Sequence, residues 1–365
     1  MTTARAALLF EPRSTVEIHD VDIPPLDDDE VLVRVAATGV CHSDLLPIEG
    51  QFTPSHWPIQ LGHEGVGYVE AVGDRVARTK PGDRVVVSFV PSCGACWWCA
   101  RGESHLCATH GTGLVHQRPR AFIDGDRPVY TAFGVATFAE LTKLGETYVI
   151  PIESDLPDDQ LALVSCSLAT GVCAVLNTAA VRAGDSVAVV GLGGVGLAAV
   201  QGARLAGAET IVGIDPLPDR RAAAASLGAT TVLDPFDGSP VKTTRLLTGG
   251  RGVDHAFEAA GRADAAALGY RLIRRGGKLV LLGAIPPHEA AAWTPADQTA
   301  AGKQVLGSVF GSAQVRRDFP MLVSLIEAGR LDVSSIISAH VPLNDINTAL
   351  RGLQDGSGIR SVVVP

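Results

Sequence analysis

Two patterns of hydrophobic and polar positions divide the chain. Over roughly the first third, short runs of Val, Ile and Tyr are broken by Gly, Asp and Pro, as is typical of β strands joined by turns. These runs are VEIHDVDIP, DEVLVRVAATGV, GVGYVEAVGD and DRVVVSFV. They predict a compact, partly barrel-like β region. A loop-rich stretch is expected from about Cys93 to Val135, and the apolar spacing then becomes helical between Pro157 and Asn177.

The second pattern alternates strands with helices. The segment DSVAVVGLGGVGLAAVQGARLAGAETIVGID predicts a buried strand, a glycine turn, a helix and a second strand. Further strands are expected in HAFEAAG and GGKLVLLGAIPP, and the pair Arg274-Arg275 before two glycines predicts the C-terminal end of a helix. This alternation indicates a parallel, doubly wound sheet. From about Gly311 the chain returns to helix and a short strand, which we assign to the first domain.

Length and charge narrow the classes of function. The 365 residues suit two domains, and the net charge of −9 with no long basic run argues against nucleic acid or an anionic membrane as a partner. The apolar run from Ala6 to Phe10 is too short for a signal peptide, and no run is long enough to cross a bilayer. We therefore expect a cytoplasmic protein.

The glycine turn fits the pattern G-x-G-x-x-G in the right context. A strand precedes it, a helix follows, and Asp215 ends the next strand. Such glycines let the backbone approach a pyrophosphate at a helix N-terminus. Asp215 is expected to bind ribose hydroxyls and to repel a 2′-phosphate, which favours NAD over NADP. The candidate cofactor contacts in this region are Gly191, Gly193, Gly194, Val195, Gly196 and, a few residues beyond the acid, Arg220.

Four of the seven cysteines form a second motif, C-x2-C-x2-C-x7-C. They are Cys93, Cys96, Cys99 and Cys107. In a reducing compartment this spacing predicts a closed tetrahedral zinc site with a structural role, and an iron–sulfur cluster is the chemical alternative. Further ligand candidates stand at Cys41, His63 and Cys166, but no local spacing links them, and an isolated buried cysteine is often a plain core residue.

Several motifs together resemble the zinc-containing alcohol dehydrogenases of the medium-chain dehydrogenase family. They are GVCHSD, GHEGVG, the four-cysteine loop, GLGGVG with Asp215, FEAAGR and GSGIRSVVV, in the family's order along essentially the whole chain. The aryl-alcohol and benzyl-alcohol branch is nearest, because His42 follows Cys41. The resemblance implies an α/β protein with a β-rich GroES-like catalytic domain and a doubly wound Rossmann coenzyme domain. We place the catalytic domain at 1–173 and 311–365, with a zinc lobe at 93–107, and the coenzyme domain at 174–310.

The same resemblance implies roles at a catalytic centre. Cys41, His63 and Cys166 would bind a catalytic zinc, leaving its fourth position for water or alcohol, so that each chain holds two zinc ions. Glu64 would lie close behind this zinc. Ser43 would take the alcohol proton, and Asp44 would fix the imidazole of His63. Cys173 is then left as a helix-packing residue.

Two departures from the family concern the cofactor and the proton. A basic residue usually follows the first zinc cysteine and grips the pyrophosphate, and here His42 would make this cofactor contact, more weakly and with a dependence on pH. Leu46 replaces the usual relay histidine, so either His42 or water passes the proton to solvent. Arg360 resembles the family's arginine that grips the cofactor phosphates, and with Thr170 it completes the predicted cofactor contacts. The long segment 108–136 resembles that of the dimeric members of the family, which implies a homodimer, with a homotetramer as the alternative.

The substrate is expected to be a primary aryl or allylic alcohol that is oxidised to its aldehyde. This rests on four aromatic residues at positions that, by the same resemblance, would face the pocket: Phe52, Trp57, Phe89 and Phe310. Other dehydrogenases remain as alternatives: an enzyme with permanently bound NAD, or one acting on S-hydroxymethylglutathione or a polyol. An NAD-responsive, zinc-bound sensor or binding module is the non-enzymatic alternative.

Overall fold

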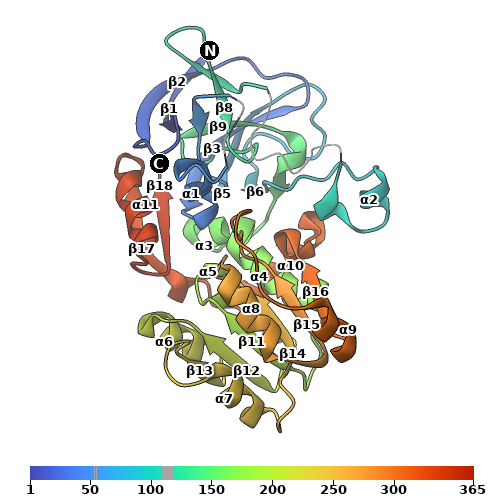
Figure 1. The fold of residues 1–365 in the computed structure, drawn as a ribbon. Helices are drawn as coiled ribbons and strands as arrows, with labels where there is room; N and C mark the ends of the chain where they lie inside the picture. Colours follow the sequence, from blue (N-terminus) through green and yellow to red (C-terminus); the bar gives the residue numbers. More distant parts are fainter. Residues whose placement is uncertain (53, 55, 109–117) are drawn as a thin grey trace. The chain divides into compact units, whose positions relative to one another are not determined.

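The computed structural model describes residues 1–52, 54, 56–108 and 118–365. The chain forms two compact units (Figure 1). The first contains Met1–Cys166, Gln314–Glu327 and Ile337–Pro365, and the second contains Ser167–Ala313 and Ala328–Ile336. The domain limits placed at 173 and 310 stay predictions. So does the homodimer, because part of the segment 108–136 lies outside the described residues.

The first unit is built on β structure, as predicted. A closed barrel contains β1 (Thr2–Leu9), β2 (Glu17–Ile23), β7 (Ala121–Ile123), β8 (Arg127–Thr131) and β4 (Ile59–Gln60). A second sheet runs in the order β10 (Val149–Pro151), β6 (Arg84–Val87), β5 (Glu64–Val72), β3 (Glu30–Gly39), β18 (Arg360–Val364) and β17 (Ile337–Pro342), with β9 (Leu141–Gly145) also paired to β3. The stretch from Cys93 to Val135 was expected to be rich in loops, but it contains the short strands β7 and β8, which complete the barrel.

Helices of the first unit connect and cover these strands. They are α1 (His42–Ile48), α2 (Trp97–Ala100), α3 (Asp158–Leu163), α10 (Val315–Glu327) and α11 (Ile346–Gln354). Strand β18 pairs antiparallel with β3, with Val362 opposite Gly39 (Figure 1). The C-terminal strand thereby lies beside the end of β3, where the chain enters α1.

One long helical segment, Asp158–Ala179, contains two π-helical turns. It runs through α3, the π turn Val164–Leu168, α4 (Ala169–Cys173) and the π turn Ala174–Ala179. Among the described residues it alone is long and apolar enough to span a membrane, but 83% of its most apolar window is buried inside the protein. It is therefore a core helix. The π turns were not predicted, and such turns are frequent at functional sites.

The second unit is a doubly wound parallel sheet, as predicted. Its strand order is β13 (Thr231–Leu233), β12 (Thr210–Ile214), β11 (Ser186–Val190), β14 (Val253–Glu258), β15 (Ile273–Leu281) and β16 (Gln304–Gly307). Its helices are α5 (Gly194–Leu205), α6 (Pro218–Leu227), α7 (Pro240–Leu247), α8 (Ala263–Leu272) and α9 (Pro295–Ala301). The strand order reverses direction between β11 and β14, and open sheets of this kind bind ligands at the carboxyl ends of the strands at that point.

The pair Arg274-Arg275 does not end a helix, so that prediction is wrong. Helix α8 stops at Leu272, and both arginines belong to β15. The reason is an ion pair: Arg274 Nε donates to Asp254 Oδ1 at 2.6 Å, which ties the start of β15 to its neighbour β14.

Asp254 supplies a test of this unit's stability. Burial raises its pKa, but hydrogen bonds from Ser186 and the contact with Arg274 outweigh burial and lower the pKa to about 2. A depressed pKa stabilises the folded state fully above the unfolded-state pKa of about 4, and that stabilisation is lost as the pH falls toward 2. We expect Asp254→Asn to lower the free energy of unfolding by about 2 kcal/mol at pH 7. Urea unfolding at pH 7 and near pH 2.5 checks this, since the difference between variant and wild type must shrink as the pH approaches the folded-state pKa of about 2.

Candidate active site and metal centres

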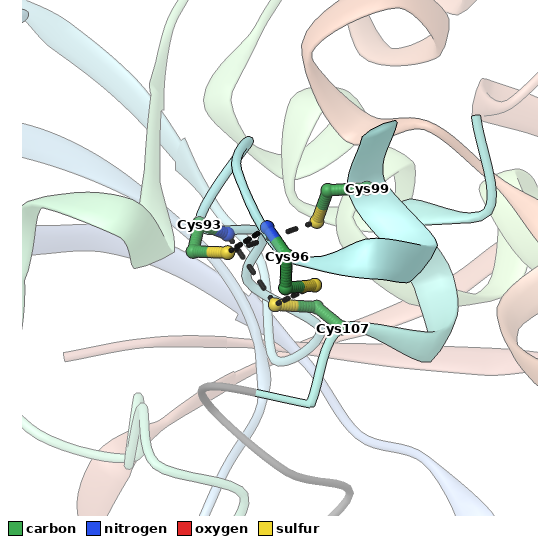
Figure 2. A group of neighbouring side chains, drawn as sticks. All are labelled: Cys93, Cys96, Cys99 and Cys107. Carbon is green, nitrogen blue, oxygen red and sulfur yellow. Dashed lines mark hydrogen bonds between the residues drawn. The ribbon is translucent and has the colours of Figure 1, made fainter. Parts of the chain in front are cut away.

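The four-cysteine loop gathers its sulfur atoms around one point (Figure 2). Cys93 Sγ lies 4.0 Å from Cys99 Sγ, and Cys96 Sγ lies 3.8 Å from Cys107 Sγ. Four thiolates at about 2.3 Å from one tetrahedral zinc ion are about 3.8 Å apart, so the spacing fits a single ion. In an iron–sulfur cluster the four thiolates are divided between two or four irons, so they do not all lie as close together as the sulfurs of this loop, which are within 4.8 Å of one another. The geometry therefore favours the zinc interpretation.

Local backbone geometry explains why this loop closes. Gly94 adopts a φ of +79°, which allows the sharp turn between the first two cysteines. The amide of Cys96 donates to Cys93 Sγ at 3.3 Å, and the amide of Cys93 donates to Cys107 Sγ at 3.4 Å. Amides directed at the sulfurs favour their ionised form, which is the form that binds metal.

A second donor cluster lies in the interior of the first unit. It consists of four buried residues whose donor atoms all lie within 4.8 Å of one another: Cys41, His63, Glu64 and Cys166. They come from different elements. Cys41 precedes α1, His63 precedes β5, Glu64 begins β5, and Cys166 lies in a π turn. Tertiary folding alone brings them together, which is why no spacing in the sequence revealed them.

One ring nitrogen of His63 is engaged by a carboxylate, and the other is available to bind a metal ion. Its Nδ1 lies 2.9 Å from Asp44 Oδ1, while its buried Nε2 has no hydrogen-bond partner among the described residues. A carboxylate on one ring nitrogen fixes the tautomer and directs the other nitrogen's lone pair at a metal. The second oxygen of Asp44 accepts the amide hydrogen of Cys41 at 3.0 Å, so one buried carboxylate orients two of the donors. Two thiols and an imidazole so arranged suit zinc.

Charges around this cluster favour an ionised thiol. The hydrogen bond from Cys166 lowers the pKa of Cys41 against the opposing effect of burial, and Arg360 and His63 lower it further. Burial raises the pKa of Glu64 to about 7, although Arg360 opposes this. Cys41 is thus prepared to act as a thiolate ligand.

Arg360 is buried against Glu64. Its Nη1 donates to the carbonyl of Val40 at 2.7 Å and lies 3.4 Å from Glu64 Oε1. Close packing at Gly39 keeps this carboxylate in place, because a Cβ there would lie 2.2 Å from Glu64 Oε2. The pairing with Glu64 was not predicted. The role of Arg360 toward cofactor phosphates stays a prediction.

Aromatic rings surround His63. The ring of Phe89 lies 5.2 Å from the imidazole, and the ring of Phe133 lies 4.7 Å from it. Phe133 was missed by the sequence analysis, and no local spacing could have revealed it. Phe52 and Trp57 are half-buried and pack against the same core of the first unit. Phe310 belongs to the second unit, so its contribution to a pocket stays a prediction.

The first turn of α1 carries the residues proposed for proton transfer. Ser43 is half-buried, with its Oγ 3.9 Å from Cys41 Sγ. His42 is exposed, and Leu46 is half-buried on the same helix. Ser43 therefore lies beside the donor cluster, and its role stays a prediction.

The glycine turn of the second unit allows neighbouring groups to approach its backbone closely. Gly191 has a φ of +93°, and a Cβ on Gly196 would lie 1.8 Å from Gly191 O, so neither position tolerates a side chain. A Cβ on Gly193 would meet nothing within 4 Å, which leaves the start of α5 open to a phosphate. Gly194 and Val195 form the first turn of this helix.

Asp215 is buried directly after β12, and its carboxylate holds the glycine turn in place by hydrogen bonds. Its Oδ2 accepts the amide hydrogen of Leu192 at 2.8 Å, and its Oδ1 accepts that of Leu217 at 2.9 Å. Arg220 Nη1 lies 4.0 Å from the same carboxylate. Thr170 is buried in α4, where its carbonyl oxygen would lie 2.6 Å from a Cβ on Gly311. These placements fit a dinucleotide, and the individual contacts stay predictions.

A zinc-type donor cluster and a dinucleotide-type sheet in one chain define a metal-dependent dehydrogenase. Residues 27–154 match the alcohol dehydrogenase GroES-like domain, and residues 194–328 match the zinc-binding dehydrogenase family. The chain is 36% identical to S-(hydroxymethyl)glutathione dehydrogenase of Escherichia coli O1:K1 over 366 residues, 99% of each protein. This chain therefore belongs to the zinc-containing alcohol dehydrogenases of the medium-chain family.

Solved structures agree with this assignment. The alcohol dehydrogenase zinc-binding domain protein of Burkholderia ambifaria is 32% identical with a TM-score of 0.93, covering 100% of this chain and 99% of its own. Benzyl alcohol dehydrogenase of Acinetobacter calcoaceticus is 29% identical with a TM-score of 0.91 and the same coverage. The protein is a zinc-dependent alcohol dehydrogenase that uses a nicotinamide cofactor, as predicted.

Proposed function

We propose that this enzyme oxidises a primary aryl or allylic alcohol to the aldehyde, reversibly, with NAD as the hydride acceptor. The observation that carries this is the pair of aromatic rings, Phe89 and Phe133, packed around the imidazole of His63. Aromatic walls beside the reacting centre favour a substrate that carries a ring or a conjugated double bond. The likeness to benzyl alcohol dehydrogenase supports the same class of substrate.

The chain's own residues would divide the chemistry as follows. Cys41, His63 and Cys166 would hold the zinc, which when bound lowers the pKa of an alcohol hydroxyl toward neutrality. Two thiolates and a neutral imidazole would compensate the charge of the ion and would leave room for the substrate oxygen. Asp44 would keep the imidazole in the correct tautomer. Ser43 would receive the hydroxyl proton and pass it on, through His42 or water.

The test is the initial rate of NADH formation with benzyl alcohol, ethanol and S-hydroxymethylglutathione, each with added NAD. We expect kcat/KM for benzyl alcohol to exceed that for ethanol by at least roughly tenfold, the scale of one or two apolar contacts. A preference for ethanol would contradict the aromatic pocket.

S-hydroxymethylglutathione oxidation is the second candidate function. The observation in its favour is the 36% identity to enzymes of that name over 99% of the chain. A glutathione adduct brings two carboxylates and an ammonium group, and it requires charged partners in the site. A higher kcat/KM for S-hydroxymethylglutathione than for benzyl alcohol would decide for this function.

The preference for NAD should depend on Asp215. Replacing it by asparagine keeps an oxygen for a backbone amide but removes the charge that would repel a 2′-phosphate. We expect Asp215→Asn to shift the ratio of kcat/KM for NADP over NAD upward by at least roughly tenfold. Asp219→Asn, on the exposed start of α6, is the matched control and should leave this ratio unchanged. If the ratio of kcat/KM for NADP over NAD is unaltered in both variants, Asp215 does not determine the choice of cofactor.

A further inference from the structure

Glu258 is a buried carboxylate that the proposed chemistry does not use. It is the last residue of β14 and is fully buried. Its Oε1 accepts hydrogen bonds from the amides of Ala260 at 2.8 Å, Gly261 at 2.7 Å and Arg262 at 3.4 Å. Its Oε2 is also buried, and the amide of Gly283 interacts favourably with the carboxylate as well. Burying a carboxylate is unfavourable, so these amide contacts must fix the turn that leads into α8.

The turn held by Glu258 packs directly against two neighbouring turns. A Cβ on Gly191 would lie 2.6 Å from the nitrogen of Ala260, and a Cβ on Gly283 would lie 2.2 Å from the nitrogen of Gly261. These turns therefore touch backbone to backbone. A shift of the 259–262 turn by an ångström must displace the glycine turn at 191–196 or the turn at 283.

Backbone pairing places this contact at the functional edge of the sheet. Glu258 lies opposite Val190, the last residue of β11, in the parallel register. The amide of Ala259 donates to Val190 O at 2.8 Å, and Glu258 O accepts from the amide of Leu282 at 2.9 Å. Strands β11 and β14 are the pair between which the strand order reverses, and ligands of such sheets bind there.

We infer that Glu258 is a positioning residue for the nicotinamide cofactor. By holding the 259–262 turn against the 191–196 turn, it sets the width of the crevice that receives the dinucleotide. The inference rests on the assignment of this edge as the cofactor site. It adds a residue that touches no cofactor and acts through the backbone.

A variant of Asp254 can distinguish a positioning role of Glu258 from a general effect on the stability of this unit. Asp254 lies on the same strand as Glu258, toward the opposite end, and its carboxylate also accepts hydrogen bonds, from the amide and hydroxyl of Ser186. Asp254→Asn therefore weakens the same unit without disturbing the carboxyl edge. A purely structural role for Glu258 would make both variants behave alike toward the cofactor.

The experiment measures the Kd of NADH by fluorescence titration, without alcohol, together with the thermal unfolding midpoint. Glu258→Ala should weaken NADH binding by about tenfold or more, the scale of losing charge-assisted hydrogen bonds. Glu258→Gln keeps an acceptor oxygen and should stay within about threefold of wild type. Asp254→Asn should lower the midpoint and leave the Kd within about twofold of wild type. In steady state, Glu258→Ala should raise KM for NAD by a larger factor than it lowers kcat.

Unchanged NADH affinity in Glu258→Ala would overturn the inference. So would equal weakening in Asp254→Asn, because the effect would then follow stability alone. If Glu258→Ala does not fold, Glu258→Asp replaces it: the carboxylate is withdrawn by one methylene and the same weakening of about tenfold is expected. Wild-type enzyme that binds neither NADH nor NADPH would instead refute the cofactor site itself.

Discussion

Replacing Cys166 by alanine should reduce kcat/KM for alcohol oxidation by at least about 1,000-fold and remove about one of two zinc ions per chain. Cys166 is buried in the π turn Val164–Leu168, and its sulfur belongs to the donor cluster with Cys41 and His63. Without it, Cys41 and His63 remain, while Glu64 is paired with Arg360, so too few donors are left to hold a catalytic zinc in a three-ligand site. Zinc content by mass spectrometry and NADH formation by absorbance check the two parts together.

Cys173 offers a matched control on the same helical segment. It is as buried as Cys166 and lies in α4, outside both donor clusters. Cys173→Ala removes the same sulfur atom and leaves a cavity of similar size. We expect it to retain about two zinc ions and a kcat/KM within about threefold of wild type. Full activity in Cys166→Ala, or equal zinc loss in both variants, would refute the assignment of Cys166 as a ligand.

Replacing Cys99 by serine should remove the other zinc ion and unfold its lobe. Metal-binding free energy in such a site is folding free energy, because the bare thiols cannot hold a short loop that has little apolar core. We expect a fall of roughly 5–10 °C in the thermal unfolding midpoint, with the remaining zinc at about one per chain. Trp97 and Trp98 stand between Cys96 and Cys99, so tryptophan fluorescence should also change.

Ser104→Ala is the corresponding control, because Ser104 lies in the same lobe and outside the cysteine cluster. It should keep both zinc ions and the wild-type midpoint. Visible absorption in the wild-type protein, with iron in place of zinc, would contradict the zinc assignment. If Cys99→Ser loses its zinc ion but keeps the wild-type thermal unfolding midpoint, this zinc ion has no structural role.

Features fixed by local spacing could be read from the sequence. The four cysteines from Cys93 to Cys107 stand in one short segment, so a single local loop can bring their thiols together without any long-range contact. The glycine turn at 191–196 could likewise be recognised locally, since a buried strand precedes it, a helix follows it, and Asp215 ends the next strand. The β region followed from short apolar runs broken by turn residues, and the parallel sheet followed from strands that alternate with helices along the chain. Parallel strands are covered on both faces, so they read as near-continuous apolar runs such as SVAVV.

The catalytic cluster could not be derived in this way. Its members are separated by up to 125 positions along the chain, from Cys41 to Cys166, and only their resemblance to a family linked them. The pairing of Arg360 with Glu64 depends on β18 joining β3, a long-range contact without a local signal. Phe133 adopts a φ of +56°, a conformation that an aromatic residue rarely takes, so no propensity argument predicts its position beside His63.

The late position of Arg360 in the chain has a consequence for biogenesis. Proteins emerge from the ribosome N-terminus first, so Cys41, His63, Glu64 and Cys166 are all synthesised long before Arg360. Until β18 pairs with β3, the carboxylate of Glu64 lacks the guanidinium that neutralises it in the interior. We therefore expect the barrel and the four-cysteine lobe to fold during translation, and the buried donor cluster to reach its final arrangement only after β18 has paired with β3. Zinc delivery to the two centres should accordingly occur at different stages of the protein's synthesis.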